Sequence, residues 1–204
     1  MKKRSDVRKI FKYELSLIQN KPLQRFVIKA LYELAPKEFW IKSASSTGQY
    51  HPMISLGRGG LIRHTKLTIW WAEKLFPMKL DFTNDDKSVV ISALLLHDIA
   101  KFGPETRNTQ RITTRNHGIV AGRQLTNFAE EQPGQSEQSI PLIVQLINGV
   151  VFHMGVWTDF EELKNSEEGF VQSSLTEFIH LCDYVSSCKV DRYFKQLKNE
   201  YSTI

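Results

Sequence analysis

The sequence predicts an all-α protein, and three observations lead to this prediction. Apolar residues recur at intervals of three and four along almost the whole chain, which is the period of a helix with one buried face. No stretch shows the clear alternation of apolar and polar residues that marks a half-buried strand. Helix start signals precede several apolar segments. The 204 residues, 41% hydrophobic and 24% charged, suffice for one buried core and exclude disorder as the main state.

Three helices are expected in the first third of the chain. The first covers about residues 6–19, and the second covers 21–35 with Pro22 in its first turn, where proline is tolerated. Residues 43–60 are rich in Ser and Gly and are expected to form a loop. The third helix covers 61–76, because its apolar residues share one face.

Four more helices are expected in the remainder. A Thr-x-x-Asp capping pattern at Thr83 starts a helix that runs to about 102, before Gly-Pro stops it. The others cover about 117–130, 139–152, and the residues from 174 onwards, where Ser and Glu again fit a capping box. Surface loops are expected at 106–116, 132–138 and 157–169.

The charge balance favours an anionic partner. The 27 basic and 22 acidic residues give a formal net charge of +5, which suits a nucleotide, a nucleic acid or a phosphorylated metabolite. Much of this excess lies at the two ends, in 2–12 and 189–198, where basic helices are commonly only solvated faces.

The sequence predicts neither export nor a membrane span. The longest nearly apolar run, 89–96, is far shorter than the ~20 residues that a span needs. The segment 13–18 that follows the basic start contains Glu14 and is too short for a signal-peptide core. Cys182 and Cys188 form no CxxC pair and are too few for a disulfide framework. We therefore expect a cytoplasmic protein.

Histidines and aspartates stand in strongly apolar segments. His64, His97 and His153 each lie in or at the end of such a segment, and Asp98 follows His97 directly. A buried carboxylate without compensation is costly. Lys101, one turn further on, could pair with Asp98, or a divalent cation could bind both His97 and Asp98.

A second aspartate, Asp183, lies on another apolar helix. Two carboxylates and several histidines from different helices are the ingredients of a metal site inside a bundle.

The order of these residues resembles a known family. His64, then His97-Asp98, then Asp183 resembles the H…HD…D signature of the HD-domain superfamily of metal-dependent phosphohydrolases. The flanking segments match the family's motifs as well: Gly59–Thr65, Leu95–Lys101 and His180–Val185. The likeness extends over about residues 50–192. It implies an HD-domain helical bundle over 50–204, with residues 1–49 as an N-terminal helical extension packed on it.

His117 and His153 fall where the two-metal branch of the superfamily places extra ligands. That branch includes 3′-to-5′ exoribonuclease HD domains and small nucleotide hydrolases. The chain departs from the pattern in one respect, because His153 stands alone where some members have a His-His pair. This departure puts the occupancy of the second metal in doubt.

The resemblance implies two ligand sets that share Asp98. One set is His64, His97, Asp98 and Asp183, and the other is Asp98, His117 and His153. Two ions held in this way would activate a water and neutralise charge on a phosphoryl group. Imidazole and carboxylate ligands suit Mn, Fe, Co, Ni or Zn without choosing among them. Lys101 would present a positive charge to the phosphate, as the lysine of the family motif does.

Other side chains near these motifs are candidates for substrate contacts. Arg63, Arg111 and Arg115 could bind phosphate or the leaving group, or could be ordinary surface charge. Trp157 could stack on a base, cover the site as a lid, or simply pack. His180, one turn before Asp183, could orient a ligand. His51 is interpreted as structural.

The leading hypothesis is a metal-dependent phosphohydrolase, a phosphodiesterase or phosphatase acting on a nucleotide, a dinucleotide or the 3′ end of a nucleic acid. One alternative is a catalytically silent HD-fold protein that binds nucleotides or nucleic acid, and another is a di-iron oxygenase. A P-loop enzyme is disfavoured because GxxxxGK[ST] does not occur. The sequence predicts neither the exact substrate nor the oligomeric state.

Overall fold

The computed structural model describes residues 4–49, 51–102, 113–132, 136–164 and 168–188, and within these ranges it is helical with no strand. The all-α prediction is confirmed. The helices are α1 (Arg4–Ile10), α2 (Lys12–Ser16), α3 (Lys21–Glu33), α4 (Lys37–Ile41), α5 (Gly60–Leu75), α6 (Asn84–Leu96), α7 (His117–Glu130), α8 (Ile140–Phe152), α9 (Phe160–Lys164) and α10 (Ser174–Ser187).

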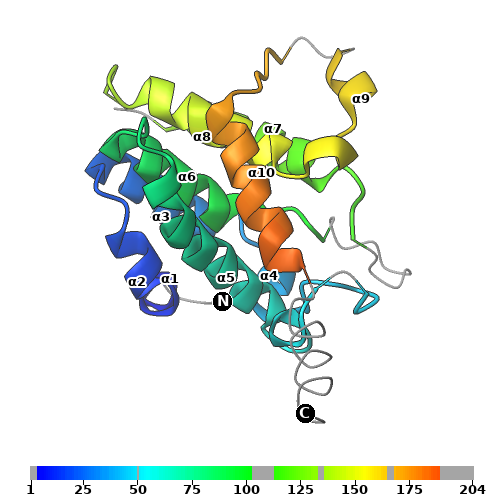
Figure 1. The fold of residues 1–204 in the computed structure, drawn as a ribbon. Coiled ribbons are helices and arrows are strands. Elements are labelled where there is room, and N and C mark those ends of the chain that lie inside the picture. Colours follow the sequence, from blue (N-terminus) through cyan, green and yellow to red (C-terminus); the bar gives the residue numbers. More distant parts are fainter. Residues whose placement is uncertain (1–3, 50, 103–112, 133–135, 165–167, 189–204) are drawn as a thin grey trace, which may run out of the picture.

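Helix α6 is the centre of the bundle (Figure 1). Every residue from Ser88 to Leu96 is buried, as expected of a helix that is apolar on all sides. It packs against α3, α5, α8 and α10, while α7 packs on α8, and α10 lies across α5 and α8. The candidate ligands follow or lie on these same central helices, so the bundle core also determines where they meet.

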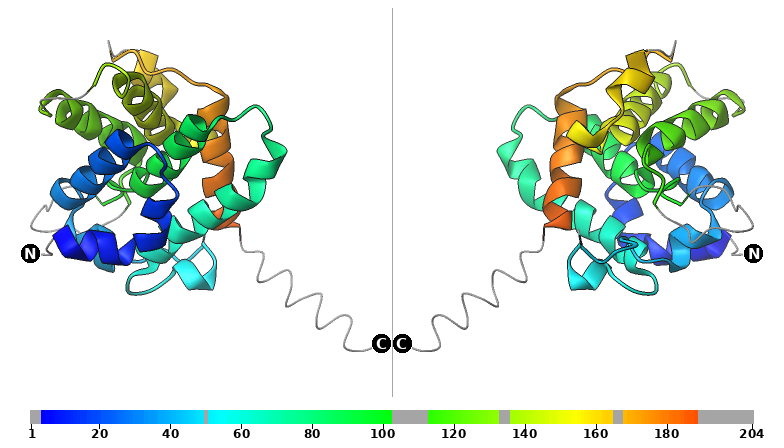
Figure 2. Two further views of the ribbon diagram at one scale, coloured as in Figure 1. Left: turned by 90° about the vertical axis from the view of Figure 1, so that its left-hand side faces the viewer. Right: turned by 90° about the vertical axis from the view of Figure 1, so that its right-hand side faces the viewer.

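The N-terminal helices share this core. Val7, Phe11 and Phe39 belong to the same cluster of buried residues as Leu94 on α6 and Cys182 on α10. The two views of Figure 2 show α1, α2 and α3 on one side of the bundle and α9 on the other. The division into 1–49 and 50–204 stays a prediction.

Capping side chains set several helix starts. Asn20 accepts a hydrogen bond from the Leu23 N–H at the start of α3. Thr83 forms the predicted capping box with Asp86 at the start of α6. The box expected at Ser174 with Glu177 lies one residue earlier, because the Ser173 hydroxyl caps α10 and the side chain of Thr176 closes the box.

Several predicted boundaries are wrong. The helix expected over 6–19 is broken at Phe11 into α1 and α2. The short helix α4 was not expected, a 3₁₀ turn (Met53–Ser55) lies in the loop 43–60, and α9 lies in the loop expected over 157–169.

The helix expected over 83–102 ends at Leu96. Beyond it the hydrogen bonds from Ile99 N to Leu96 O (3.0 Å) and from Lys101 N to Asp98 O (3.1 Å) span three residues and form tight turns.

None of the helices in the described part of the chain has the length and apolar character needed to cross a membrane.

Candidate metal centre

The structure brings the six predicted metal ligands together at the middle of the bundle. His64 lies on α5, His97 and Asp98 follow α6, His117 is the first residue of α7, His153 follows α8, and Asp183 lies on α10. Five of the six are buried, and the Asp183 side chain is 20% exposed. The helix ends therefore converge, although up to 119 residues separate these side chains in the sequence.

Three of the histidines are held by backbone carbonyls. In each case the ring Nδ1 lies within hydrogen-bond distance of the carbonyl oxygen three residues earlier: His97 to Leu94 (2.7 Å), His117 to Thr114 (2.8 Å) and His153 to Val150 (2.7 Å). A carbonyl oxygen only accepts, so Nδ1 carries the ring proton. The Nε2 atom of each neutral ring consequently has a free lone pair.

His64 is oriented through a serine. Its Nδ1 lies 3.3 Å from Ser186 Oγ, and the Ser186 hydroxyl donates to the Asp183 carbonyl at 2.7 Å. The Ser186 oxygen is thus left to accept the Nδ1–H of His64. All four rings then have Nε2 as the free nitrogen, an arrangement typical of metal-binding histidines.

The Nε2 atoms face one another in two pairs. His64 and His97 Nε2 are 3.3 Å apart, and His117 and His153 Nε2 are 3.1 Å apart. Two nitrogen lone pairs at this distance repel each other. Each pair therefore needs a positive charge between its members, which a proton or a metal cation can supply.

The Asp98 carboxylate lies between the two pairs. Its Oδ1 is 3.0 Å from His117 Nε2 and 3.7 Å from His153 Nε2, while its Oδ2 is 3.4 Å from His97 Nε2 and 3.7 Å from His64 Nε2. Oδ1 is buried and accepts no hydrogen bond. One oxygen of the carboxylate thus faces each pair, as a carboxylate that bridges two cations would.

Asp183 flanks the first pair. Its Oδ1 lies 2.9 Å from His64 Nε2 and 3.7 Å from His97 Nε2, and this oxygen is also buried without a hydrogen bond. A buried carboxylate oxygen without a hydrogen bond is costly. A cation beside it would remove that cost.

The local electrostatics differ among the candidate ligands: burial alone would lower the pKa of His97, but Asp98 beside it raises this pKa above its usual value. Burial alone would raise the pKa of Asp98, but the Lys101 ammonium 2.6 Å away, together with His97, His117 and His153, outweighs burial and holds this pKa well below its usual range. Burial lowers the pKa of His153 to about 4. At pH 7 the Asp98 carboxylate is therefore ionised and the His153 imidazole neutral, as metal ligands must be.

Two groups of three residues could each hold a divalent cation. The donor atoms of His64, His97 and Asp98 all lie within 4.8 Å of one another, and so do those of Asp98, His117 and His153. The unsatisfied oxygens, the facing nitrogens and the oriented rings all fit such an ion. Imidazole and carboxylate ligands do not select one metal among Mn, Fe, Co, Ni and Zn.

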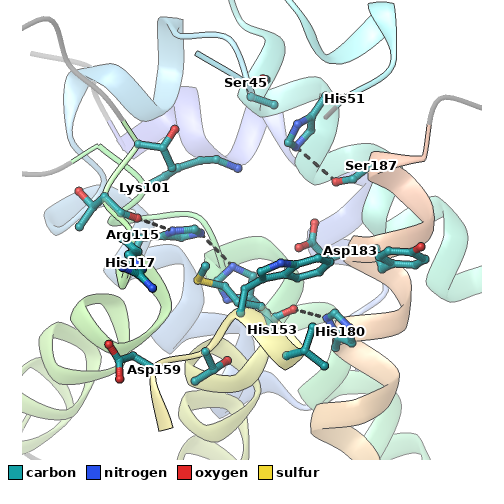
Figure 3. A pocket seen from close by; sticks show the side chains of 18 of the residues that line it. Ser45, His51, Lys101, Arg115, His117, His153, Asp159, His180, Asp183 and Ser187 are labelled. Carbon is teal, nitrogen blue, oxygen red and sulfur yellow. Dashed lines mark hydrogen bonds between the residues drawn. The ribbon is translucent and has the colours of Figure 1, made fainter. Parts of the chain in front are cut away.

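A cavity of about 1050 Å³ lies beside these groups. Lys101, Arg115, His117, His153, Asp183 and Trp157 are among its lining residues (Figure 3). Lys101 is buried, pairs with Asp98 and also lines the cavity. An ion pair with Asp98 and a positive charge presented to a phosphate are therefore compatible roles for Lys101.

The cavity also has exposed and aromatic lining residues. Arg115 is exposed, and so is Trp157, whose ring lies 6.4 Å from that of Tyr184 with the planes 21° apart. These two exposed, nearly parallel rings lie on the cavity wall beside the candidate ligands.

The structure does not place Arg63 at this site. Its guanidinium donates hydrogen bonds to the carbonyls of Ile54, Leu56 and Arg58 at 2.5, 2.7 and 2.9 Å. Arg63 therefore supports the loop before α5, and it is not among the residues that line the cavity. Arg111 lies outside the described residues.

Sequence reasoning assigned no binding role to two residues of the cavity wall. Tyr184 follows Asp183 directly and lines the cavity. His51, interpreted as structural, also lines it, and burial followed by the neighbouring His64 lowers the pKa of His51 to about 3. The only sign of this position in the sequence was that His51 stands in a Ser- and Gly-rich loop just before the first ligand motif.

His180 acts as a support. Its Nδ1 lies 2.7 Å from the His153 carbonyl, and a Cβ at Gly155 would collide with its ring. Gly155 has a φ of +56°, in the region that favours glycine. His180 thereby fixes the turn between the candidate ligand His153 and the cavity residue Trp157.

Comparison with known proteins identifies no relative: no protein-family model, curated protein or solved structure matches this chain.

Proposed function

We propose that this protein is a metal-dependent phosphohydrolase of the HD-domain superfamily. The observation that supports the proposal is the shared position of Asp98. Its two oxygens face separate histidine pairs, each of which could hold a divalent cation. The alternative role of Lys101 as a simple ion-pair partner does not account for the facing Nε2 atoms.

When bound, two cations at these groups would polarise a phosphoryl group and lower the pKa of a bound water toward neutrality. The chain's own residues would hold the cations and orient the phosphoryl group. Asp98 contacts both groups, and Asp183 adds a carboxylate to the first. Lys101 places a fixed positive charge at the cavity wall, where it can bind a phosphoryl oxygen and balance the charge that develops in hydrolysis.

We propose a nucleotide, a dinucleotide or the 3′ end of a nucleic acid as the substrate. Trp157 and Tyr184 offer aromatic rings on which a base can stack. Arg115 is available to the phosphate, and the net charge of +5 favours an anion. The cavity volume of about 1050 Å³ is at the upper end of the range for small-molecule sites. We keep the cytoplasm as the proposed location, since both cysteines are free thiols.

The test is hydrolysis by protein reconstituted with Mn²⁺. We expect release of nitrophenol from bis(4-nitrophenyl) phosphate, and turnover of at least one member of a panel of nucleotides, cyclic dinucleotides and short RNA or DNA. Asp98→Ala should abolish both metal binding and turnover. Asp81→Asn, at an exposed carboxylate outside this cavity, is the matched control and should leave both unchanged.

Two outcomes would contradict the proposal. Hydrolysis by the Asp98→Ala variant at the wild-type rate would contradict the metal-dependent mechanism. A folded, metal-loaded protein that binds nucleotides but turns over none of the panel would favour the silent binding protein.

A further inference from the structure

His51 carries a buried nitrogen that the proposed metal centre does not use. The residue is 9% exposed, and its Nδ1 is buried and has no hydrogen-bond partner. A buried polar atom left without a partner is costly and calls for an explanation. The ring lines the cavity and packs edge-on against the ring of His64, with the ring centroids 4.7 Å apart.

The other ring nitrogen has a partner. His51 Nε2 lies 3.3 Å from the Ser187 hydroxyl at the end of α10 (Figure 3). When this hydroxyl donates to Nε2, the ring proton is on Nδ1. Nδ1 is then a hydrogen-bond donor, held in place by Ser187 on one side and by the ring of His64 on the other.

A metal role does not explain His51. Among the described residues its nitrogens belong to no group of donors close enough to share an ion, and the two groups found contain His64 but not His51. Lys101, Asp98 and Asp183 are all close enough for their charges to act on the His51 ring. A ring N–H can bind only an acceptor, and the Lys101 ammonium on the same cavity wall is the group that could share an anionic acceptor with it.

The surroundings fit a phosphoryl group. Figure 3 shows Ser45 and His51 on the side of the cavity away from His180 and Asp159, with the Lys101 side chain directed toward them. Ser45 Oγ accepts the Gly48 N–H at 3.0 Å and lies 3.5 Å from Thr47 Oγ1, so its hydroxyl proton can be directed either to Thr47 or into the cavity. An ammonium, a ring N–H and a hydroxyl thus line the same wall.

We propose that His51 is a substrate-binding residue, which donates from Nδ1 to a phosphoryl oxygen that Lys101 also contacts, with Ser187 as its positioning residue. The inference rests on the proposed function for the identity of the anion as a phosphoryl group. It concerns binding, however, and can be tested without turnover.

The experiment measures the Kd of inorganic phosphate for the Mn²⁺-loaded protein by calorimetry, with metal content determined on the same samples. His51→Ala should weaken phosphate binding about ten-fold, as expected for a lost hydrogen bond to a charged group. His51→Asn places an amide N–H near the position of Nδ1 and should recover most of the affinity. His51→Gln places the amide N–H near the position of Nε2, where it can still contact Ser187, and should not recover the phosphate affinity.

Asp81→Asn, at an exposed side chain outside the cavity, is the control. It should keep phosphate affinity within two-fold. Wild-type affinity in His51→Ala, or rescue by Gln and not by Asn, would overturn the proposal in favour of a structural role through Ser187. Loss of bound metal in all three His51 variants would overturn it too, because His51 would then support His64.

The result is distinguishable from a failure of the proposed function. A protein that binds phosphate through His51 but hydrolyses nothing would retain this inference and lose the enzyme. If the wild-type protein hydrolyses phosphoesters but His51→Ala binds phosphate with unchanged affinity, the enzyme is retained and this inference is lost.

Discussion

Gly118, the second residue of α7, lies where α7 meets the end of α8. A Cβ at this position would be 2.7 Å from the carbonyl oxygen of Val151 and 3.3 Å from Cε1 of His153. The carbonyl belongs to a helix backbone and cannot swing aside as the end of a flexible side chain can. We therefore expect Gly118→Ala to push the start of α7 away from α8 and to separate His117 from His153.

The size of this effect follows from the overlap. Inserting a methyl group into a packed helix contact costs about 1–3 kcal/mol of unfolding free energy. Losing the support that orients ligands lowers metal affinity about 10–100-fold. The loss should fall on the group formed by Asp98, His117 and His153, since the contact does not involve His64 or His97.

The assay is a calorimetric titration with Mn²⁺ together with urea unfolding. Gly122→Ala, one turn further along α7, is the matched control. Its added methyl would overlap the Val151 side chain and no ligand, so stability should fall while both affinities remain. A Gly118→Ala protein with reduced stability but unchanged affinity at both groups would refute the idea that this helix contact holds the second group together.

Three further predictions concern other parts of the chain. Arg63→Ala should lower the unfolding free energy by about 1–3 kcal/mol without changing Mn²⁺ affinity, as measured by urea unfolding and calorimetry. Arg63→Lys should not restore the lost stability, because an ammonium cannot make the three hydrogen bonds of the guanidinium. Thr83→Ala should cost about 1 kcal/mol by removing the cap of α6, again measured by urea unfolding. Burial raises the pKa of Cys182 to about 12, so at pH 9 a thiol reagent should modify the half-buried Cys188 quickly and Cys182 only after unfolding; equal reaction rates would contradict this.

The sequence predicts the long helices well because their signals are local. The bounds of α7 match the expectation, and the start of α6 follows from the capping residues around Thr83. Helix α4 was missed because five residues after Pro36 are too few to show a helical period. The end of α6 was misplaced because the turns after Leu96 have the same apolar composition as the helix itself.

His64, His97, Asp98 and Asp183 could be chosen from the sequence because polar side chains in apolar segments need an explanation, whereas the ligand roles of His117 and His153 were expected only from the resemblance to the HD-domain superfamily. Their convergence is observed only in the structure, since it depends on how five separate segments pack. Arg63 was misjudged for the same reason: its position beside His64 in the sequence does not reveal that its side chain turns to the loop carbonyls. For His51 the sequence offers only its position in a Ser- and Gly-rich loop just before the first ligand motif, which does not reveal that the ring lines the cavity.

Whether this bundle holds two cations can be seen by anomalous diffraction from crystals soaked in Mn²⁺. We expect two peaks per chain, with Asp98 between them: one beside His64, His97 and Asp183, and one beside His117 and His153. Crystals of Asp98→Ala should show neither at comparable occupancy. Strong peaks elsewhere in the molecule, with none beside these histidines, would contradict the account.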